Sequence, residues 1–207
     1  MDRLPWELFN FANSLKFTKV GDAVDYAITE LPDYLVLAFE PSSDNEDWKN
    51  NFRFARKLYK HQLSCMKVHR GYGNAWRTCN DLIIKQLRDW KEKTCKPLLI
   101  LGWSYGGAMS ILAAEDWHYR TGNKAMVVTF GAPKVAGNKK TRDYFANVMD
   151  IVQWENRNDI VRYVPPLPSY KHVSLQDCGD EEFGLLKLFN AKKYHQQYGD
   201  RKIYEEK

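Results

Sequence analysis

A short segment near the middle of the chain restricts the fold more than any other part of the sequence. Residues 98–102, LLILG, form an apolar run of strand length, and AMSILAAEDW at residues 108–117 favours a helix. Between these runs lie Gly102, Ser104, Gly106 and Gly107. A strand that passes into a helix through so tight a turn needs residues without side chains two positions before and after the serine. The segment therefore predicts a strand, a sharp turn and a helix, with Ser104 at the turn.

Apolar runs of strand length alternate with segments of helical character along the rest of the chain. We expect strands at residues 34–39, 98–102, 125–130 and 151–154, and helices at 48–59, 73–90, 105–118 and 139–148. Strands that are apolar throughout are covered on both faces, and their alternation with helices indicates a mainly parallel sheet flanked by helices. The fold class is therefore α/β. A chain of 207 residues without a linker predicts a single domain over residues 1–207.

Charge and cysteine content argue against two classes of function. The net charge is +5, but the 31 basic residues are interleaved with 26 acidic ones, which is typical of a solvated surface and argues against nucleic-acid binding. Weak, transient contact with an anionic membrane surface stays open. The cysteines, at 65, 79, 95 and 178, form no C-x-x-C pair and have no histidine at zinc-ligand spacing, so we expect no metal site and free, mostly buried thiols.

The ends of the chain lead to two further expectations. Asp2, Pro5 and Glu7 interrupt the first 17 residues where a secretory signal needs an unbroken apolar stretch. Elsewhere no run approaches the roughly 18 apolar residues of a membrane span. We therefore expect a soluble, cytoplasmic protein. The polar segment RKIYEEK at residues 201–207 predicts a frayed end.

A serine at a strand-to-helix turn suits nucleophilic chemistry. Its hydroxyl stands above the sheet, and the first turn of the helix directs unpaired N–H groups toward it. The backbone N–H of Tyr105 is then a donor to an oxyanion. Because a serine hydroxyl is a weak nucleophile at neutral pH, Ser104 needs a histidine as base and an acid that orients the histidine.

The order of serine, acid and histidine in the α/β-hydrolase fold selects the partners of Ser104. Asp159 follows the strand expected at residues 151–154, so it lies at the same carboxyl edge of the sheet as Ser104. Only two of the five histidines, His172 and His195, come after Asp159. Spacing does not distinguish between them.

Five sequence blocks together resemble the class 3 lipases, the family that includes the fungal triacylglycerol lipases. YLVLAFEPSSDNEDW resembles the strand and lid segment with its F-R-G-S or F-R-G-T core, and KVHRGYGNAW resembles V-H-x-G-F. GWSYGG stands in place of G-H-S-L-G-G, TFGAPKVAGN resembles F-G-x-P-R-V-G-N, and NRNDIVRYVPPLPSYKH resembles N-x-x-D-x-V-P-x-L-P-P. The blocks follow the order of the family and span roughly residues 34–200, which is most of the chain.

The resemblance implies an α/β-hydrolase fold and assigns two further residues. The catalytic histidine of the family opens an H-x-x-Y segment, which His195 does in YHQQYG, whereas His172 takes the place of a non-catalytic loop histidine. Ser42 falls at the position whose backbone N–H is the second oxyanion donor. The implied enzyme is a carboxylic ester hydrolase acting on lipid or small-molecule esters, with no metal and no cofactor. The oligomeric state stays open.

The chain departs from the family pattern at several positions. Glu40 and Pro41 replace Arg-Gly before the oxyanion serine, and Trp103 replaces the histidine before Ser104. The lid segment, residues 43–57, is strongly charged, which argues against strong activation at interfaces and favours soluble or dispersed esters. The changes at Glu40, Pro41 and Trp103 support an alternative, a lipase-like protein that binds a ligand or acts in signalling. Retention of all three triad residues favours the enzyme.

Overall fold

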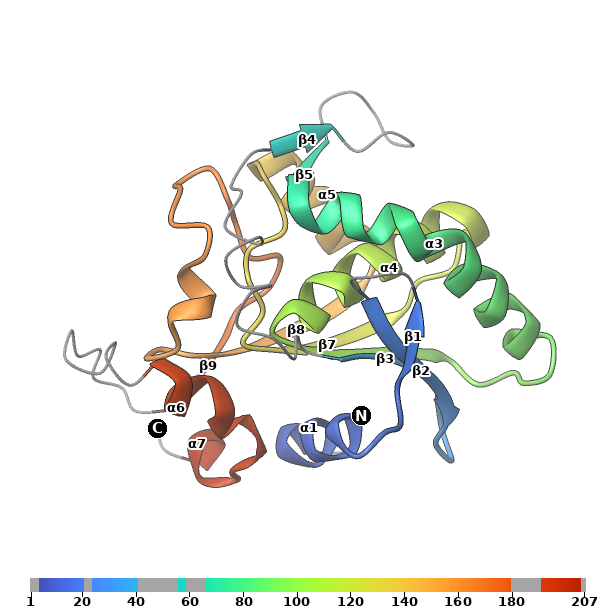
Figure 1. Ribbon diagram of the computed structural model, residues 1–207, viewed down its shortest axis with the longest axis horizontal. Coiled ribbons are helices and arrows are strands. Elements are labelled where there is room, and N and C mark those ends of the chain that lie inside the picture. The colour runs from blue at the N-terminus through green and yellow to red at the C-terminus, as the bar shows by residue number, and fades with distance from the viewer. Residues whose placement is uncertain (1–3, 21–23, 41–55, 59–65, 180–190, 206–207) are drawn as a thin grey trace.

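A seven-stranded sheet runs through the middle of the protein in the computed structural model, which describes residues 4–20, 24–40, 56–58, 66–179 and 191–205 (Figure 1). Its strands, in spatial order, are β1 (Thr18–Val20), β2 (Val24–Glu30), β3 (Leu35–Phe39), β6 (Leu98–Trp103), β7 (Met126–Phe130), β8 (Asp150–Asn156) and β9 (Gln176–Cys178). The first three strands pair antiparallel, and all pairs from β3 to β9 are parallel. The expected mainly parallel sheet is therefore confirmed.

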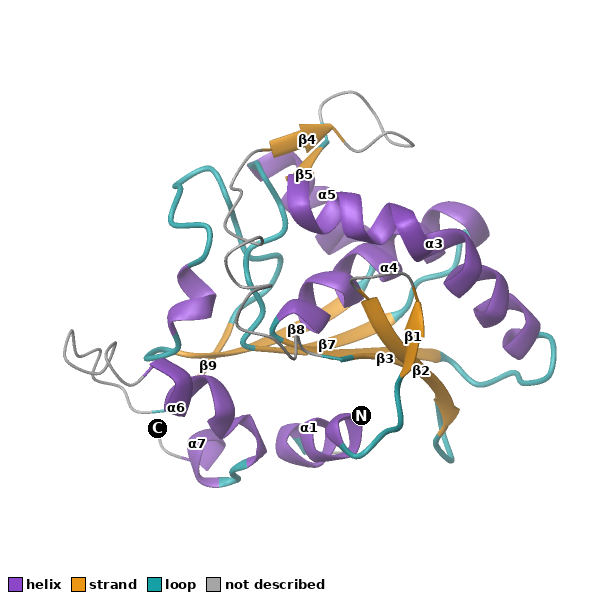
Figure 2. Cartoon of the chain, viewed as in Figure 1, coloured by secondary structure: helices purple, strands orange, loops and turns teal. Residues whose placement is uncertain are grey.

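Helices cover both faces of this sheet (Figure 2). One face carries α3 (Arg70–Lys91), α4 (Tyr105–Thr121) and α5 (Lys139–Val148), and the other carries α1 (Pro5–Asn13), α6 (Ala191–Gln196) and α7 (Lys202–Glu205). The remaining elements are a two-stranded sheet of β4 (Arg56–Leu58) and β5 (Lys67–His69), and the 3-10 helices η1 (Ile160–Tyr163) and η3 (Gln197–Gly199).

The central strands are apolar throughout because each of their faces enters a different core. In β3, Leu35 and Leu37 pack with the α3 and α4 layer, whereas Val36 and Ala38 pack with the α1 layer. All four side chains are fully buried. Successive side chains of a strand point to opposite faces. When helices cover both faces, neither set of side chains meets solvent, so apolar residues occupy every position.

Most of the expected elements are present. The four expected strands correspond to β3, β6, β7 and β8. The helix expected at residues 139–148 has the bounds of α5, and those expected at 73–90 and 105–118 are α3 and α4, each a few residues longer. The fold class and the helical layers were thus accessible from apolar patterning alone.

The helix expected at residues 48–59 is wrong where the structure describes it. Residues Arg56–Leu58 form β4, which pairs antiparallel with β5 and places Arg56 opposite His69. Residues 48–55 and 59 lie outside the described part of the chain. A strand of three residues carries no readable period of its own, and its conformation depends on a partner strand elsewhere in the chain.

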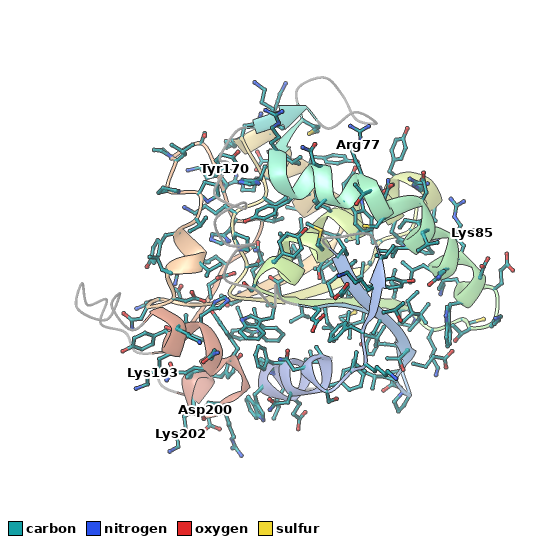
Figure 3. All side chains as sticks on the ribbon, in the orientation of Figure 1. Arg77, Lys85, Tyr170, Lys193, Asp200 and Lys202 are labelled. Carbon is teal, nitrogen blue, oxygen red and sulfur yellow. The ribbon has the colours of Figure 1, made fainter. Side chains whose placement is uncertain are left out.

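The expectation of a frayed end at residues 201–207 is also wrong as far as Glu205. This stretch contains α7, in which Ile203 is buried and Tyr204 packs edge-on against Trp154 with ring centroids 5.1 Å apart. Figure 3 shows that Lys202 in this stretch points outward, as do Lys193 and Asp200, which precede it in the chain. Two apolar side chains are enough to fix a single helical turn against the sheet.

Two further findings concern only the residues that the structure describes. No helix among them has the length and apolar character to cross a lipid bilayer. Cys79, Cys95 and Cys178 are free thiols, of which Cys79 and Cys178 are buried and Cys95 is exposed. Cys65 lies outside the described residues.

Candidate active site

Ser104 occupies a strained turn between β6 and α4. Its φ of 56° and ψ of −124° make it the one non-glycine residue with positive φ in the described part of the chain. Such a conformation costs on the order of 1–3 kcal/mol and persists only where the surroundings enforce it. Here the backbone N–H of Ser104 donates to the carbonyl of Phe130 at the end of β7, 2.9 Å away. The side chain is 6% exposed and stands at the carboxyl end of β6.

Glycines allow the strand and helix to approach at this turn. A Cβ on Gly102 would collide with the carbonyl of Gly106 and the hydroxyl of Ser110. A Cβ on Gly106 would lie 2.5 Å from the carbonyl oxygen of Phe39, at the end of β3. The spacing of glycines around Ser104 is therefore a steric requirement of the fold.

The first turn of α4 brings backbone donors to the same place. Tyr105 is the first residue of α4, so its N–H lies at the positive end of the helix dipole. The ring of Tyr105 packs edge-on against Tyr72 with centroids 5.8 Å apart, which anchors the turn on α3. Ser42, the other expected oxyanion donor, lies outside the described residues.

Asp159 and His195 form a buried hydrogen-bonded pair. Asp159 follows β8, and its fully buried carboxylate accepts the Nδ1–H of His195 on Oδ2 over 2.7 Å. The backbone N–H of Val161 donates to Oδ1 over 2.9 Å, so the side chain of Asp159 caps η1. His195 lies on α6 and is 8% exposed. A carboxylate on Nδ1 leaves Nε2 as the basic nitrogen of the neutral ring.

Trp103 places His195 beside the serine turn. Trp103 directly precedes Ser104 at the end of β6, and its indole ring lies 5.2 Å from the imidazole of His195, tilted by 36°. The indole also packs edge-on against Phe9 of α1, with centroids 5.3 Å apart. The indole that replaces the family histidine therefore contacts the imidazole of His195.

Tyr198, to which the sequence interpretation assigned no role, supports the same pair. Its buried hydroxyl donates to Oδ2 of Asp159 over 2.9 Å and accepts the backbone N–H of Asn156 over 2.9 Å. Burial and the nearby Asp159 raise the pKa of Tyr198 well above its usual value, so the hydroxyl stays a donor. The signal for it was the H-x-x-Y spacing, because Tyr198 follows His195 by three positions.

His172 is held elsewhere by the loop between η1 and β9. Its Nε2 donates to the carbonyl of Arg162 over 2.7 Å, and its Nδ1 accepts from the amide of Gln153 over 3.3 Å. Burial lowers the pKa of His172 to about 4, so the ring is neutral near neutral pH. The carboxylate of Asp159 thus meets His195, and His172 serves as a hydrogen-bonded loop residue.

A second buried carboxyl lies next to this pair. Glu155 of β8 is fully buried, and its Oε1 accepts the backbone N–H of Ala132 over 3.0 Å. Burial, and after it the charge of Asp159, raises the pKa of Glu155 well above its usual value. Among the described residues, no group of three or more histidine, cysteine or acidic side chains has the arrangement of a metal site.

Known proteins provide the context for this geometry. The chain matches the family Lipase (class 3) over residues 36–169, more than half its length. It belongs to the class 3 lipases. Mono- and diacylglycerol lipase A, a secreted protein of Penicillium cyclopium, is 27% identical over 158 residues, which cover 75% of this chain and 51% of that relative. The chain thus spans about half the length of this curated relative.

Solved structures of fungal lipases share the fold. The native propeptide complex of Rhizomucor miehei lipase superposes with a TM-score of 0.71 at 21% identity, covering 80% of this chain and 56% of that one. A second structure is that of a triacylglycerol lipase whose catalytic centre is a serine protease triad; its TM-score is 0.70 at 20% identity, with 81% and 66% covered. The chain has the α/β-hydrolase fold of these structures.

Proposed function

We propose that this class 3 lipase hydrolyses carboxylic esters with Ser104 as nucleophile, His195 as general base and Asp159 as the acid that orients His195. The observation that carries the proposal is the buried 2.7 Å hydrogen bond between Nδ1 of His195 and Oδ2 of Asp159. The contact between Trp103 and His195 brings this pair to the turn that holds Ser104. Nucleophile, base and orienting acid are the three parts that acyl transfer to a serine requires.

The reaction proceeds through an acyl-enzyme. Nε2 of His195 accepts the hydroxyl proton of Ser104 as its oxygen attacks the ester carbonyl, and the resulting imidazolium is stabilised by Asp159. The backbone N–H groups of Tyr105 and Ser42 hold the oxyanion. His195 then protonates the departing alcohol. Water, deprotonated by the same imidazole, attacks the acyl-serine and releases the acid.

The neighbours of Asp159 keep it in place during this cycle. Its two oxygens accept three hydrogen bonds, from His195, Tyr198 and the N–H of Val161. Hydrogen bonds to an ionised carboxylate are short and strong. A fixed negative charge under Nδ1 favours formation of the imidazolium and holds the tautomer that presents Nε2 to Ser104.

Lipid esters are the proposed substrates. The relative from Penicillium cyclopium acts on mono- and diacylglycerols by its name, and the second solved structure is of a triacylglycerol lipase. The charged segment at residues 43–57 favours dispersed over interfacial substrate, so we expect little rate increase when micelles form. Contact with a membrane surface would then be transient.

The proposal is tested by variants of the serine and of the two histidines. Ser104→Ala and His195→Ala should each lower kcat on short p-nitrophenyl esters by more than about a thousandfold, because loss of either disables the same proton transfer. His172→Ala, which removes a ring bonded to Arg162 and Gln153, is the matched control and should keep kcat within about threefold.

A fluorophosphonate probe separates hydrolysis from binding alone. The native protein should be labelled at Ser104, and the Ser104→Ala variant should not. Native protein that folds but is neither labelled nor active would reject the enzyme and favour a lipase-like binding protein. A dead His172→Ala variant beside an active His195→Ala variant would reject the assignment of the base.

A further inference from the structure

Glu155 is a buried carboxyl that the proposed reaction does not use. It lies on β8, four residues before Asp159, and none of its surface is exposed. Its Oε1 accepts the N–H of Ala132 over 3.0 Å, while its buried Oε2 has no hydrogen-bond partner within the described part of the chain. Burying a polar side chain costs free energy unless a hydrogen bond offsets it. We therefore ask which group the Glu155 carboxyl binds.

The group held by Glu155 is the turn that leaves β7. The spatial order β6, β7, β8 places the end of β7 between Ser104 and Asp159. In this turn the N–H of Gly131 donates to the carbonyl of Trp154, 2.9 Å away, and the N–H of Ala132 donates to Glu155. Two consecutive backbone donors therefore fasten the turn to β8, one on the main chain and one on the carboxyl.

This turn contacts both halves of the proposed machinery. Gly131 has a φ of 52°, and a Cβ there would lie 2.6 Å from Oδ2 of Asp159 and 3.0 Å from the hydroxyl of Tyr198. On the other side, a Cβ on Gly107 would lie 2.7 Å from Cβ of Ala132. The Gly131–Ala132 turn is thus packed between Asp159 and the start of α4. A shift of this turn would change the position of Asp159 relative to α4.

The charge state of Glu155 follows from its surroundings. Burial raises the pKa of Glu155 most, the charges of Asp159 and Asp177 raise it further, and the charge of Arg162 lowers it. The guanidinium of Arg162 pairs with Asp177 over 2.8 Å and donates to the main-chain carbonyl of Glu155 over 3.3 Å. Burial and the neighbouring carboxylates therefore favour the neutral form of the Glu155 carboxyl.

We propose that Glu155 is a positioning residue for the hydrolytic reaction: its carboxyl accepts the N–H of Ala132 and thereby fixes the Gly131–Ala132 turn between Asp159 and α4. The inference rests on the proposed function of Ser104, Asp159 and His195. It requires an acceptor of this length at position 155 and does not require a charge. Glutamine should therefore replace Glu155, whereas aspartate is one methylene too short and leucine offers no acceptor.

Kinetics of four variants test this requirement. Glu155→Gln should keep kcat on a soluble p-nitrophenyl ester within about threefold of native, and Glu155→Leu and Glu155→Asp should lower kcat by about tenfold or more with KM nearly unchanged, because small displacements of catalytic groups are costly. Thr129→Val is the matched control, since it removes a buried hydroxyl that has no partner in the described part of the chain and should leave kcat unchanged.

A spectroscopic signature reports on position without turnover. The Nδ1–H of His195, bonded to Asp159, should give a downfield proton resonance that is absent from His195→Ala. Glu155→Gln and Thr129→Val should retain this resonance, and Glu155→Leu and Glu155→Asp should shift or broaden it. If native protein is inactive and unlabelled by fluorophosphonate, the proposed function fails, while the resonance still decides whether Glu155 positions the pair.

The pH dependence of stability tests the neutral state. Because the pKa of Glu155 is raised on folding, the unfolded chain releases this proton at a lower pH than the folded chain, and the stability that the neutral acid contributes is lost as pH rises above about 4.5. Glu155→Gln cannot ionise, so its unfolding midpoint relative to native should rise between about pH 5 and pH 8. A difference that stays flat overturns the neutral acid. The positioning role is overturned if folded Glu155→Leu keeps native kcat and an unchanged resonance. If the leucine variant does not fold, the same result in Glu155→Asp overturns it.

Discussion

At the scale of single residues, Tyr198 joins a side chain and a backbone group through one hydroxyl. It donates to Asp159 and accepts from the N–H of Asn156, with both bonds out of contact with water. Tyr198→Phe should therefore destabilise the fold by about 1–3 kcal/mol and lower kcat by about tenfold, since it leaves a buried N–H unsatisfied and removes a donor from a charged carboxylate. Urea unfolding and initial rates on a p-nitrophenyl ester measure the two effects.

A second tyrosine supplies the control for this substitution. The hydroxyl of Tyr26 donates to Gln86 over 2.6 Å, between β2 and α3, in the layer that does not carry His195. Tyr26→Phe should change stability modestly and leave kcat at the native value. Equal losses of kcat in the two variants would show that Tyr198 acts only through general stability.

Site residues differ in how far sequence reasoning could reach them. Ser104 could be nominated from its local context, because the glycines and the flanking strand and helix are neighbours in the chain. Asp159 could be nominated from chain order, which left two histidines open. The contacts of Trp103 with His195 and of Glu155 with Ala132 depend on side chains that meet only after folding, so no local pattern predicts them.

At the scale of elements, α1 forms the support beneath the histidine-bearing segment. Phe9 packs against Trp103, Phe130 and Tyr198, with ring centroids 5.3 to 6.1 Å apart. Asn10 adds a hydrogen bond from its side-chain amide to the carbonyl of Gly199, 3.2 Å away. Phe9→Ala should destabilise the protein by about 3–5 kcal/mol and also lower kcat, because the cavity lies directly under Trp103 and Tyr198.

Phe145 provides a matched deletion on the opposite face of the sheet. It is fully buried on α5, in the core shared with α3 and α4. Phe145→Ala should lose comparable stability while the folded fraction keeps native kcat, measured at a temperature well below both unfolding midpoints. If Phe9→Ala retained native kcat, α1 would be a stabilising helix without influence on the site.

Burial on both faces made an element readable in the sequence more than its length did, since β2 with seven residues and α1 with nine were not expected. Strands β3, β6 and β7 are buried along almost their whole length, so their apolar runs stand out in the sequence, whereas β8 is less buried and its apolar run is shorter. The sequence did not predict the C-terminal helices, because α6 spans six residues and α7 four, which is too short for a helical period to be visible. Strand β4 escaped because three residues gain their conformation from pairing with β5.

At the scale of the whole molecule, the site depends on how closely α4 approaches the sheet. Gly106 touches the end of β3, where an added Cβ would lie 2.5 Å from the carbonyl of Phe39 and 2.9 Å from that of Glu40. Gly106→Ala should therefore push the first turn of α4 off the sheet and lower kcat/KM by about a hundredfold, because it displaces Ser104 and the N–H of Tyr105 together. The remaining activity is measured on the folded fraction.

The far end of the same helix offers the comparison. Gly122 ends α4 with a φ of 73°, and a Cβ there would meet no atom within 4 Å. Gly122→Ala should cost about 1–2 kcal/mol through its left-handed backbone while kcat/KM stays native. Native kcat/KM in Gly106→Ala would mean that the helix can shift without moving the nucleophile.

Helix α6, which carries His195, lies on the same side of the sheet as α1 (Figure 1). The site therefore combines segments that the ribosome makes at different times. A growing polypeptide exposes the serine turn and the loop of Asp159 well before position 195 leaves the ribosome. On the proposed function, the nascent chain is inert until His195 is made and its imidazole reaches Asp159 and Trp103. The proposed activity thus begins only when the segment that carries His195 has been made and has folded onto the rest of the chain. A ribosome-stalled chain that ends before residue 191 should therefore resist labelling by fluorophosphonate.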